Sequence, residues 1–257
     1  MNLLFVADVF GKPGREALLH WLPRFRRERD VGFAIVNGEN AANGAGITSK
    51  IAERLLSGGV DVITTGNHVW RQREVFSFLA TDERIVRPAN YPSGAPGRGL
   101  TVRAGSDGSP VAVINLAGEL FMSSGLSPFR VVDRLVEEAA ALADTIVVDI
   151  HAEATSEKVA LGHYLDGRVT AVLGTHTHVQ TSDARVLPGG TAYMTDVGMT
   201  GPRDSVIGVR TDVILRRFTT EMPQQFEVAE GPVRLDAALV GVEAGRATAI
   251  EAIEVIL

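Results

Sequence analysis

The chain has 257 residues, with 25 Lys and Arg against 31 Asp and Glu, which gives a formal net charge of −6. At roughly 150 residues per domain, this length allows one large domain or two small ones. Hydrophobic residues make up 45% of the chain and charged residues 22%, a composition that supports a folded core and argues against disorder. Cysteine is absent, which excludes disulfides, thiolate metal sites and a cysteine nucleophile.

The sequence predicts neither a membrane span nor a secretory leader. Its longest stretch without Asp, Glu, Lys or Arg, residues 169–182, is shorter than the about 20 apolar residues that a transmembrane helix needs. Met1-Asn2 leads directly into an apolar run, with no basic region before it. We therefore expect a cytoplasmic protein. Its net negative charge argues against stable nucleic-acid binding, because a basic face is the usual footprint of such binding.

Six short apolar runs rich in Val, Ile and Leu predict β-strands that are buried on both faces. They are residues 3–7, 33–36, 60–64, 111–116, 145–150 and 169–173. Apolar residues at helical spacing predict helices at 14–29, 48–56 and 131–143, the second with Thr48 or Ser49 as its N-cap. Strands that alternate with helices predict an α/β fold with a largely parallel or mixed sheet.

The pattern changes after about residue 185, where shorter strands are expected between Gly and Pro turns. The expected strands are 191–196, 206–218, 226–228, 235–242 and 247–257. Because no linker-like segment separates them from the rest, we expect a second sheet packed on the first rather than a separate domain. The loop 90–108, rich in Gly and Pro, is either a surface excursion or a lid, and the sequence leaves this open.

Polar side chains follow the predicted strands at their carboxyl ends. The first is followed by Asp8, the second by Glu39-Asn40, the third by Asn67-His68, the fifth by His151, and the sixth by His176 and His178. Because the carboxyl ends of parallel strands line the ligand crevice of open α/β sheets, these groups can converge. His20 and His163 lie outside this pattern, and we expect them to be structural or solvent-exposed.

Most of these residues also have an ordinary structural explanation. Asp8 could cap the helix that starts near residue 14, Glu39 could belong to a turn, and His68 could bond to backbone. His176 and His178 are harder to explain in this way. Two imidazoles two positions apart on an extended segment point the same way and can share a metal ion.

Together the set offers two carboxylates, two carboxamides and four imidazoles, too many ligands for one structural zinc ion. It fits two divalent ions such as iron, manganese or zinc that share a bridging carboxylate, and this ligand chemistry does not choose among the three metals. Such a pair lowers the pKa of a bridging water and offsets negative charge during displacement at phosphorus. The set therefore indicates a dinuclear site for phosphoester chemistry.

The order of these motifs resembles that of the calcineurin-like metallophosphoesterases, whose pattern is Asp-x-His, Gly-Asp, Gly-Asn-His, a later His and Gly-His-x-His. Longer strings resemble one bacterial branch of that superfamily, the YmdB-type phosphodiesterases. These strings are GENAA at 38–42, RPANYP at 87–92, HAEATSEK at 151–158, THTHVQT at 175–181 and TDVGMTG at 195–201. The resemblance extends over nearly the whole chain.

The resemblance implies one domain over residues 1–257, folded as a four-layer α/β/β/α sandwich with a dinuclear site at strand carboxyl ends. The first ion would be held by Asp8, Glu39, Asn40 and His178, and the second by Glu39, Asn67, His151 and His176. Glu39 would bridge the two ions. His68 matches the histidine that protonates the leaving oxygen in the family. Iron or manganese is the expected metal, with zinc as an alternative.

Three positions depart from the broad superfamily pattern. The Asp-x-His motif ends in Phe10, so one histidine ligand of the first ion is missing, and the resemblance to the branch implies that Asn40 fills its place. The bridging residue is Glu39 rather than an aspartate. Val69 stands where an acid often follows the Gly-Asn-His histidine, which leaves open what orients His68.

The resemblance implies a metal-dependent phosphodiesterase that hydrolyses 2′,3′-cyclic nucleotides, with 3′,5′-cyclic nucleotides as a further candidate. A hydroxide bridging the ions would attack phosphorus, with His68 as general acid. Loop position suggests Asn90, Tyr91 and Thr177 as substrate contacts.

Two alternatives remain open at this point. One is a regulatory protein that binds a nucleotide or a protein and keeps a vestigial metal site; the other is a metal-dependent amidohydrolase or deacylase. Under the leading interpretation the partner is a small phosphodiester, no membrane or stable nucleic-acid partner is expected, and a homo-oligomer is left open.

Overall fold

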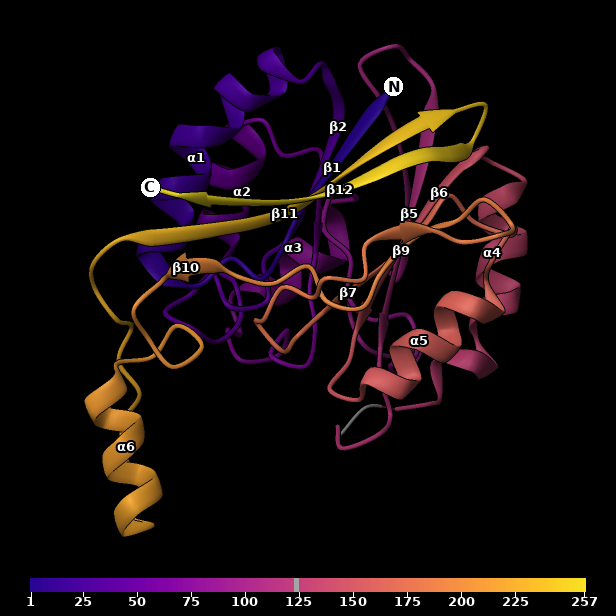
Figure 1. The fold of residues 1–257 in the computed structure, drawn as a ribbon. Helices are drawn as coiled ribbons and strands as arrows, with labels where there is room; N and C mark the ends of the chain where they lie inside the picture. Colours follow the sequence, from indigo (N-terminus) through magenta and orange to yellow (C-terminus); the bar gives the residue numbers. More distant parts are fainter. Residues whose placement is uncertain (123–124) are drawn as a thin grey trace.

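The computed structural model describes residues 1–122 and 125–257, which form two β-sheets with helices on their outer sides (Figure 1). The first sheet has the order β10-β11-β1-β2-β3, and β12 pairs with β11. Its strands are β1 (Asn2–Val6), β2 (Val31–Asn37), β3 (Val62–Thr64), β10 (Thr200–Pro202), β11 (Val233–Glu243) and β12 (Arg246–Ile256). β1, β2 and β3 are parallel, whereas β11 is antiparallel to β1.

The second sheet has the order β4-β5-β6-β7-β9-β8. Its strands are β4 (Leu100–Ala104), β5 (Pro110–Ala117), β6 (Thr145–His151), β7 (Ala171–Thr175), β8 (Arg185–Val186) and β9 (Ala192–Met194). β5, β6, β7 and β9 are parallel, and the edge strands β4 and β8 are antiparallel to their neighbours. Each sheet therefore has a block of parallel strands that end at a common edge.

The helices connect or flank these strands. They are α1 (Gly11–Glu28), α2 (Ser49–Ser57), α3 (Val75–Thr81), α4 (Val132–Ala140), α5 (Thr155–Tyr164) and α6 (Thr211–Thr220), with a short 3-10 helix η1 (Pro128–Arg130) before α4. Thr48 is the N-cap of α2, because its hydroxyl accepts a hydrogen bond from the backbone N–H of Ile51 (3.2 Å), as the sequence predicted. No helix within 1–122 and 125–257 is both long and apolar enough to cross a bilayer.

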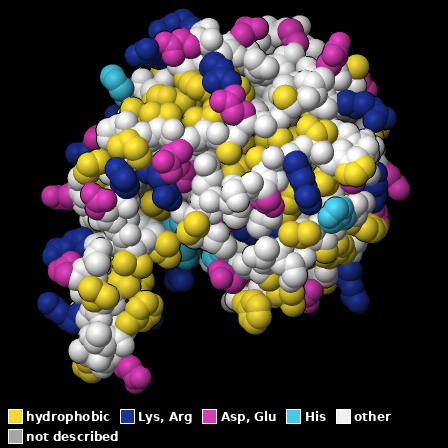
Figure 2. Space-filling view, viewed as in Figure 1, with side chains coloured by type: hydrophobic (Ala, Val, Ile, Leu, Met, Phe, Trp, Pro, Cys, Tyr) yellow, Lys and Arg dark blue, Asp and Glu magenta, His cyan; other side chains and the backbone are white. Residues whose placement is uncertain are grey.

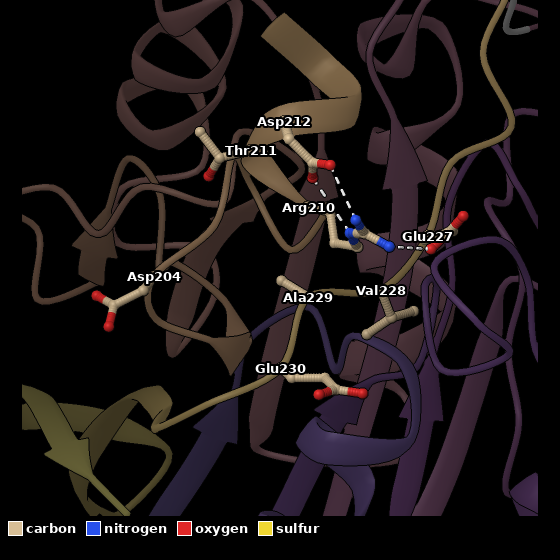
Figure 3. Close-up of a pocket in the computed structure, with 8 residues that line it drawn as sticks. All are labelled: Asp204, Arg210, Thr211, Asp212, Glu227, Val228, Ala229 and Glu230. Carbon is tan, nitrogen blue, oxygen red and sulfur yellow. Dashed lines mark hydrogen bonds and ion pairs between the residues drawn. The ribbon is translucent and has the colours of Figure 1, made fainter. Parts of the chain in front are cut away.

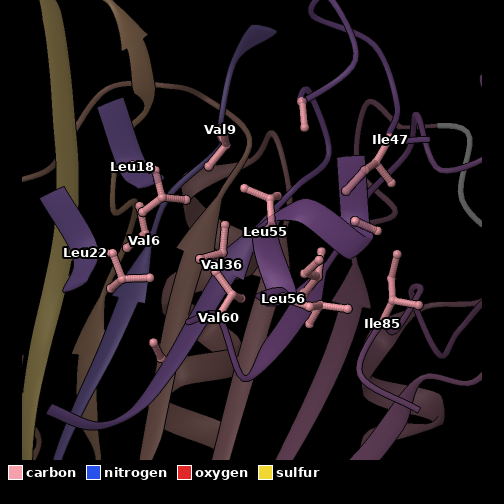
Figure 4. Packing of buried hydrophobic residues seen from close by; sticks show 14 of the residues in the cluster. Val6, Val9, Leu18, Leu22, Val36, Ile47, Leu55, Leu56, Val60 and Ile85 are labelled. Atoms are coloured by element: carbon pink, nitrogen blue, oxygen red, sulfur yellow. The ribbon is translucent and has the colours of Figure 1, made fainter. Parts of the chain in front are cut away.

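Alternation along the strands sends apolar side chains to opposite faces of each sheet. On the outer face of the first sheet, Val6 and Val36 pack with Leu18 and Leu22 of α1 and Leu55 of α2 (Figure 4). This cluster covers the sheet with helices because both helices turn their apolar stripe towards it.

The neighbouring residues in the same strands point the other way. Leu3 and Phe5 of β1 meet Val113, Val147 and Leu173 of the second sheet in a core between the two sheets. A third cluster joins the second sheet to α4 and α5. The layers therefore follow the order helix, sheet, sheet, helix, which confirms the predicted α/β/β/α sandwich.

The predicted division of strands between the sheets is wrong. We expected the strands after residue 185 to form a second sheet by themselves, but β10, β11 and β12 join β1–β3, while β8 and β9 join β5–β7. Hydrogen-bond pairing across the chain decides this: β11 pairs with β1 from Asn2↔Gly241 to Val6↔Ala237. Apolar runs predict that a strand is buried but carry no information about its neighbour.

The predicted strand at 206–218 is also wrong. Val206 and Val209 form only isolated bridges, one of them to Val228, and the helix α6 follows from Thr211. The run is rich in β-branched residues, but Gly208 has a φ of 99°, which ends the extended segment. The predicted strand at 226–228 reduces to the bridge at Val228, whereas that at 247–257 is confirmed as β12.

Two further differences concern loops and short helices. The loop predicted at 90–108 contains β4, which pairs with β5, so it is less irregular than its Gly and Pro content indicated. Helices α3 and α5 were not predicted, because neither has a strong apolar stripe in its sequence. Figure 1 shows α6 projecting away from the body of the molecule at lower left.

Candidate metal centre

The predicted site residues meet where the parallel strands of both sheets end. Asp8 follows β1, Glu39 and Asn40 follow β2, Asn67 and His68 follow β3, His151 ends β6, and His176 and His178 follow β7. Contacts between the sheets join the two halves. The Asp8 carboxylate accepts the backbone N–H of His176 (3.0 Å), and Glu39 Oε1 lies 3.4 Å from His151 Nε2.

Two acidic side chains are buried at the base of the site. Asp8 is 0% and Glu39 1% exposed, and burial raises the pKa of each to about 7. Glu39 Oε1 accepts the backbone N–H of His68 (2.8 Å), while Glu39 Oε2 has no hydrogen-bond partner among the described residues. A buried, unpartnered carboxylate oxygen is costly unless a cation or proton satisfies it.

The imidazole of His151 is held in one tautomer by a chain of hydrogen bonds. Thr175 Oγ1 donates to Asp149 Oδ1 (2.8 Å) and therefore accepts the Nδ1–H of His151 (2.9 Å). Asn37 Nδ2 donates to the other Asp149 oxygen (2.9 Å). The lone pair of His151 Nε2 then points towards Glu39 and Asn67, whose Oδ1 lies 3.1 Å away. Groups that bond to the ring nitrogen pointing away from a metal site, called outer partners below, orient metal-ligating histidines.

His178 and His176 are fixed in the same manner. His178 Nδ1 donates to the carbonyl oxygen of Ile207 (3.0 Å), which leaves its Nε2 facing Asp8. His176 Nε2 lies 3.1 Å from Glu153 Oε2, so its Nδ1 is the nitrogen that faces the site. Burial is the main cause that lowers the pKa of all three imidazoles, to about 4 for His151 and about 3 for His176. Neutral imidazole is the form that binds metal.

One contact within this group is unfavourable without a cation. His176 Nδ1 and His151 Nε2 lie 3.1 Å apart, and the outer partners of both rings leave a lone pair on each of these nitrogens. Their mutual approach, together with the unpartnered Glu39 oxygen, is the arrangement that a shared positive ion would stabilise. The donor set of oxygen and nitrogen therefore fits divalent metal ions.

The side chains are not in a closed ligand geometry. Within the described part of the chain, no group of three or more His, Asp and Glu side chains is placed so that it could hold an ion as it stands. Asn40 shows why: its Nδ2 donates to Asp8 Oδ1 (3.3 Å) and lies 2.9 Å from His178 Nε2, so an amide N–H₂ occupies the place of a cation between two acceptors. A half-turn of this carboxamide would present its oxygen there instead.

Phe10, which replaces the histidine of the superfamily motif, supports His178 by packing. The rings of Phe10 and His178 meet edge to face, with their centres 5.8 Å apart. Gly44 and Gly208 make room for Phe10, because a Cβ at either position would lie 2.6 Å from its ring. Sequence reasoning found the substitution but not this role.

His68 lies at the edge of the site and is oriented by two residues from the first sheet. Its Nδ1 lies 3.0 Å from Asn40 Oδ1 and 3.2 Å from Glu39 Oε1. These acceptors fix the ring and leave Nε2 available on the cavity side, where His68 is part of the wall. This answers what orients His68 in the absence of a following acid.

The segment that carries His176 and His178 is not extended, so the stated reason for pairing them was wrong. β7 ends at Thr175, and His176 and His178 have φ values of 102° and 63°. Non-glycine residues in this region are strained by about 1–3 kcal/mol each and cluster at functional sites. The bend, rather than the alternation of a strand, turns both rings towards the first sheet.

A buried ion pair holds this bend. Lys158 Nζ donates to Asp196 Oδ2 (2.6 Å) and to the carbonyl of Thr175 (2.7 Å), and both charged side chains are 1% exposed. The same Asp196 oxygen accepts the N–H (3.1 Å) and hydroxyl (2.8 Å) of Thr177. Lys158 and Asp196 lie within two of the recognised sequence strings, but their pairing is a product of the fold.

A cavity of about 510 Å³ opens beside these side chains. Its polar wall includes Asn40, Asn43, His68, Glu153, His176, Thr177, His178 and Glu227, and its apolar wall includes Phe10, Ile207, Val209, Phe226 and Val228. Both the volume and the mixed lining are typical of small-ligand sites.

A second cavity of about 420 Å³ lies at the base of α6 (Figure 3). Arg210 pairs with two of its four acidic residues, with Nη2 2.8 Å from Asp212 Oδ2 and Nη1 2.6 Å from Glu227 Oε2. None of the predicted site residues lines this cavity. It shares Glu227 and Val228 with the wall of the first cavity.

The suggested substrate contacts are only partly placed at the site. Thr177 lines the cavity, but Asn90 and Tyr91 do not. Asn90 Nδ2 donates to the carbonyls of Ala117 (2.7 Å) and Leu126 (2.6 Å), so its role is structural. Tyr91 packs against Trp70 in the core. As expected, His20 and His163 are exposed and lie on α1 and α5.

Comparisons with known proteins agree with this architecture. The family described as “YmdB-like protein” matches residues 4–253. The chain is 49% identical over 244 residues to the 2′,3′-cyclic-nucleotide 2′-phosphodiesterase of Bacillus subtilis (strain 168), covering 95% of this chain and 92% of that one.

Two crystal structures have the same fold. A hypothetical protein from Thermus thermophilus superposes with a TM-score of 0.94 at 45% identity, covering 100% of this chain and 99% of that chain. A novel phosphatase from Mycoplasma pneumoniae superposes with a TM-score of 0.91 at 34% identity, covering 100% and 93%. The resemblance found in the motifs is thereby confirmed, and the chain belongs to the YmdB-like protein family of metallophosphoesterase-type folds.

Proposed function

We propose that this protein is a metal-dependent phosphodiesterase that hydrolyses 2′,3′-cyclic nucleotides, with 3′,5′-cyclic nucleotides as a second substrate class. The name and 49% identity of the Bacillus subtilis relative support the diesterase reaction. The proposal includes two divalent ions per chain, iron or manganese ahead of zinc, one domain over residues 1–257 and a cytoplasmic location.

The observation that carries the proposal is the convergence of three oriented imidazoles with two buried carboxylates. His151, His176 and His178 each have their outer nitrogen beside a fixed oxygen, and their inner nitrogens face the side of Asp8 and Glu39. In the proposed assignment, the first ion is held by Asp8, Glu39, Asn40 and His178, and the second by Glu39, Asn67, His151 and His176. When bound, such ions supply an ionised water at neutral pH and offset charge on the phosphate.

The chain itself supplies the proton for the leaving oxygen. His68 Nδ1 lies 3.2 Å from Glu39 Oε1, which favours a proton on that nitrogen, whereas the Asn40 oxygen 3.0 Å away would turn towards the first ion when that ion binds. In the imidazolium form, with a proton on each nitrogen, its Nε2 donates a proton to the alkoxide that leaves phosphorus, as a general acid, and the ring returns to the neutral Nδ1–H form.

A panel of substrates tests the proposal. Protein loaded with iron, manganese or zinc is assayed with 2′,3′- and 3′,5′-cyclic nucleotides, linear dinucleotides and phosphomonoesters, and bound metal is measured by elemental analysis. We expect two ions per chain and turnover of cyclic diesters. Hydrolysis of monoesters alone would contradict the diesterase assignment, and a metal-free, inactive protein would favour the regulatory alternative.

A further inference from the structure

The apolar wall of the site cavity supplies none of the proposed metal ligands. It includes two large side chains that are open to solvent, Ile207 (51% exposed) and Phe226 (48% exposed). Exposed apolar groups next to a polar site commonly mark the part of a cleft that takes an apolar portion of a ligand.

Ile207 is held there by a strained backbone. Its φ of 47° is unfavourable for a β-branched residue, and such strain concentrates at ligand sites. In this conformation Ile207 contributes both its backbone carbonyl and its side chain to the site. Its carbonyl accepts the Nδ1–H of His178 (3.0 Å), and its side chain lines the cavity. The apolar wall is thus fixed relative to the metal-site histidine by a direct hydrogen bond.

Phe226 lies at the other end of the segment that begins at Val209 and includes α6. The chain leaves the wall at Val209, forms α6, and returns at Phe226, where Val228 bridges back to Val209. The guanidinium carbon of Arg217 lies 5.0 Å from the centre of the Phe226 ring, a cation–π contact that holds the ring in place. A half-exposed aromatic ring in a fixed orientation is a stacking surface.

We propose that this wall is the subsite for the base of a nucleotide, with Phe226 stacking on the base and Ile207 packing against its edge. The inference rests on the proposed diesterase function and adds where the nucleoside lies. A cavity of about 510 Å³ is within the usual range for small-molecule sites and larger than a phosphate group alone requires. The occupant is an aromatic base because the wall offers the Phe226 ring together with the aliphatic side chains of Ile207, Val209 and Val228.

The apolar wall predicts a preference for substrates that carry a base, whichever base it is. Stacking on an aromatic side chain is tolerant of base identity, because every base has a π-face. We therefore expect purine and pyrimidine nucleotides to be accepted, while a cyclic phosphate without a base is a poor substrate.

The experiment compares two substrates with the same reacting group. Metal-loaded protein is assayed with adenosine 2′,3′-cyclic phosphate and with 1-O-methylribose 2′,3′-cyclic phosphate, which has no base. In the Phe226→Ala variant, the ratio of kcat/KM for the first substrate to that for the second should fall about fivefold to tenfold, mainly through KM. Phe226→Tyr should restore the ratio.

Phe218→Ala is the matched control. Phe218 lies on α6, is 74% exposed, and does not line the cavity, so its removal should leave the ratio unchanged. If the apolar residues of this region serve only to dock a protein or a second copy, Phe218→Ala would change the oligomeric state and Phe226→Ala would leave the ratio as in the parent protein. That result would overturn the base subsite.

A binding measurement separates this inference from the proposed function. Calorimetric titration of the metal-loaded protein with adenosine 3′-monophosphate and with ribose 5-phosphate needs no turnover. Tighter binding of the nucleotide that is lost in Phe226→Ala supports the subsite even if no diester is hydrolysed. Equal binding of both compounds by the parent protein would overturn it even if the diesterase activity is present.

Discussion

The two sheets contribute different chemistry to one crevice. The first sheet contributes mainly the oxygen donors of the proposed metal site and the proposed general acid, from Asp8, Glu39, Asn40, Asn67 and His68. The second sheet supplies three imidazoles, from His151, His176 and His178. Neither group could bind two ions alone, so the site depends on the packing between the sheets as much as on its own residues.

The two groups also differ in how they are held. The carboxylates of Asp8 and Glu39 lie directly after their strands and accept backbone N–H groups. The imidazoles need outer partners, because a ring must have one particular nitrogen free to bind metal. Thr175 with Asp149, Glu153 and the Ile207 carbonyl meet that need. Most of the supporting residues are therefore associated with the second sheet.

The largest effect is expected from removing an imidazole ligand. His176→Ala deletes the nitrogen that faces His151, so at least one of the two proposed ions should be lost and diester turnover should fall by about 10³-fold or more. Elemental analysis and steady-state kinetics measure both quantities. His163→Ala, which removes an exposed histidine on α5, should change neither. Two ions per chain in His176→Ala would refute the ligand assignment.

Removing His68, the histidine of the first sheet, should lower turnover but not metal content. His68→Ala should slow turnover by about 10²–10⁴-fold through loss of the general acid, while the metal content stays at the parent level. The deficit should shrink with a p-nitrophenyl diester, whose leaving group needs no proton. Parent-level turnover of cyclic nucleotides by this variant would remove His68 from the role.

The support of the imidazoles is tested at Thr175. Thr175→Val removes the hydroxyl that accepts from His151 Nδ1, and metal affinity should fall by about 10–100-fold. Thr175→Ser keeps the hydroxyl and should retain the affinity. Metal titration by calorimetry gives the constants, and thermal unfolding of the metal-free proteins checks that the core is intact. Equal affinities for the two variants would show that the outer partner is unimportant.

The last expected effect, a pH dependence of metal affinity, should come from the two buried carboxyl groups of the first sheet. Burial raises the pKa of Asp8 and Glu39 to about 7, so below that pH each carboxyl group holds a proton that a cation must displace. The pKa of His151 is lowered to about 4 and that of His176 to about 3, so these rings are already neutral. Metal affinity should therefore rise with pH up to about 7 and then level off, by about tenfold per pH unit for each proton released.

Calorimetry in two buffers of different ionisation enthalpy counts these protons. At about pH 6, metal binding by the parent protein should release protons, and Glu39→Gln, which has no carboxyl proton to release, should release fewer. A metal affinity that is constant between about pH 6 and about pH 8 would contradict the assignment of the raised pKa values to ligands.

The sequence was sufficient to predict which side chains meet in the crevice, because most of them follow strand ends. Glu39 and His151 are separated by more than a hundred positions, yet both follow buried apolar runs, and parallel strands bring their carboxyl ends to one edge. The helices α1, α2 and α4 were predicted for a similar reason, since each has an apolar stripe. Apolar periodicity reports local burial directly.

Features that depend on distant partners were not predictable in this way. The β-branched run 206–218 indicated a strand, but from Thr211 onwards it forms α6, and in the described part of the chain its β-pairing is limited to the bridges at Val206 and Val209. Asn90 was suggested as a substrate contact from its loop position, but its side-chain amide donates to backbone carbonyls that come close to it only in the folded chain. The outer partner Asp149 lies within a strand, where sequence gives no reason to connect it with Thr175.

By itself, the sequence determined the family, the layered α/β architecture and the identity of the candidate ligands, because burial and motif order are local properties of the chain. Tertiary structure alone decided which sheet each strand joined, the tautomers of the three imidazoles, the support of His178 by Phe10 and the apolar wall formed by Ile207 and Phe226. Figure 2 shows the outer surface of the same molecule, where yellow apolar side chains gather along the α6 projection as well as on the main body. The strand pairing, the tautomers, the packing of Phe10 and the apolar wall depend on contacts between segments far apart in the chain, and such contacts leave no periodic pattern in the sequence.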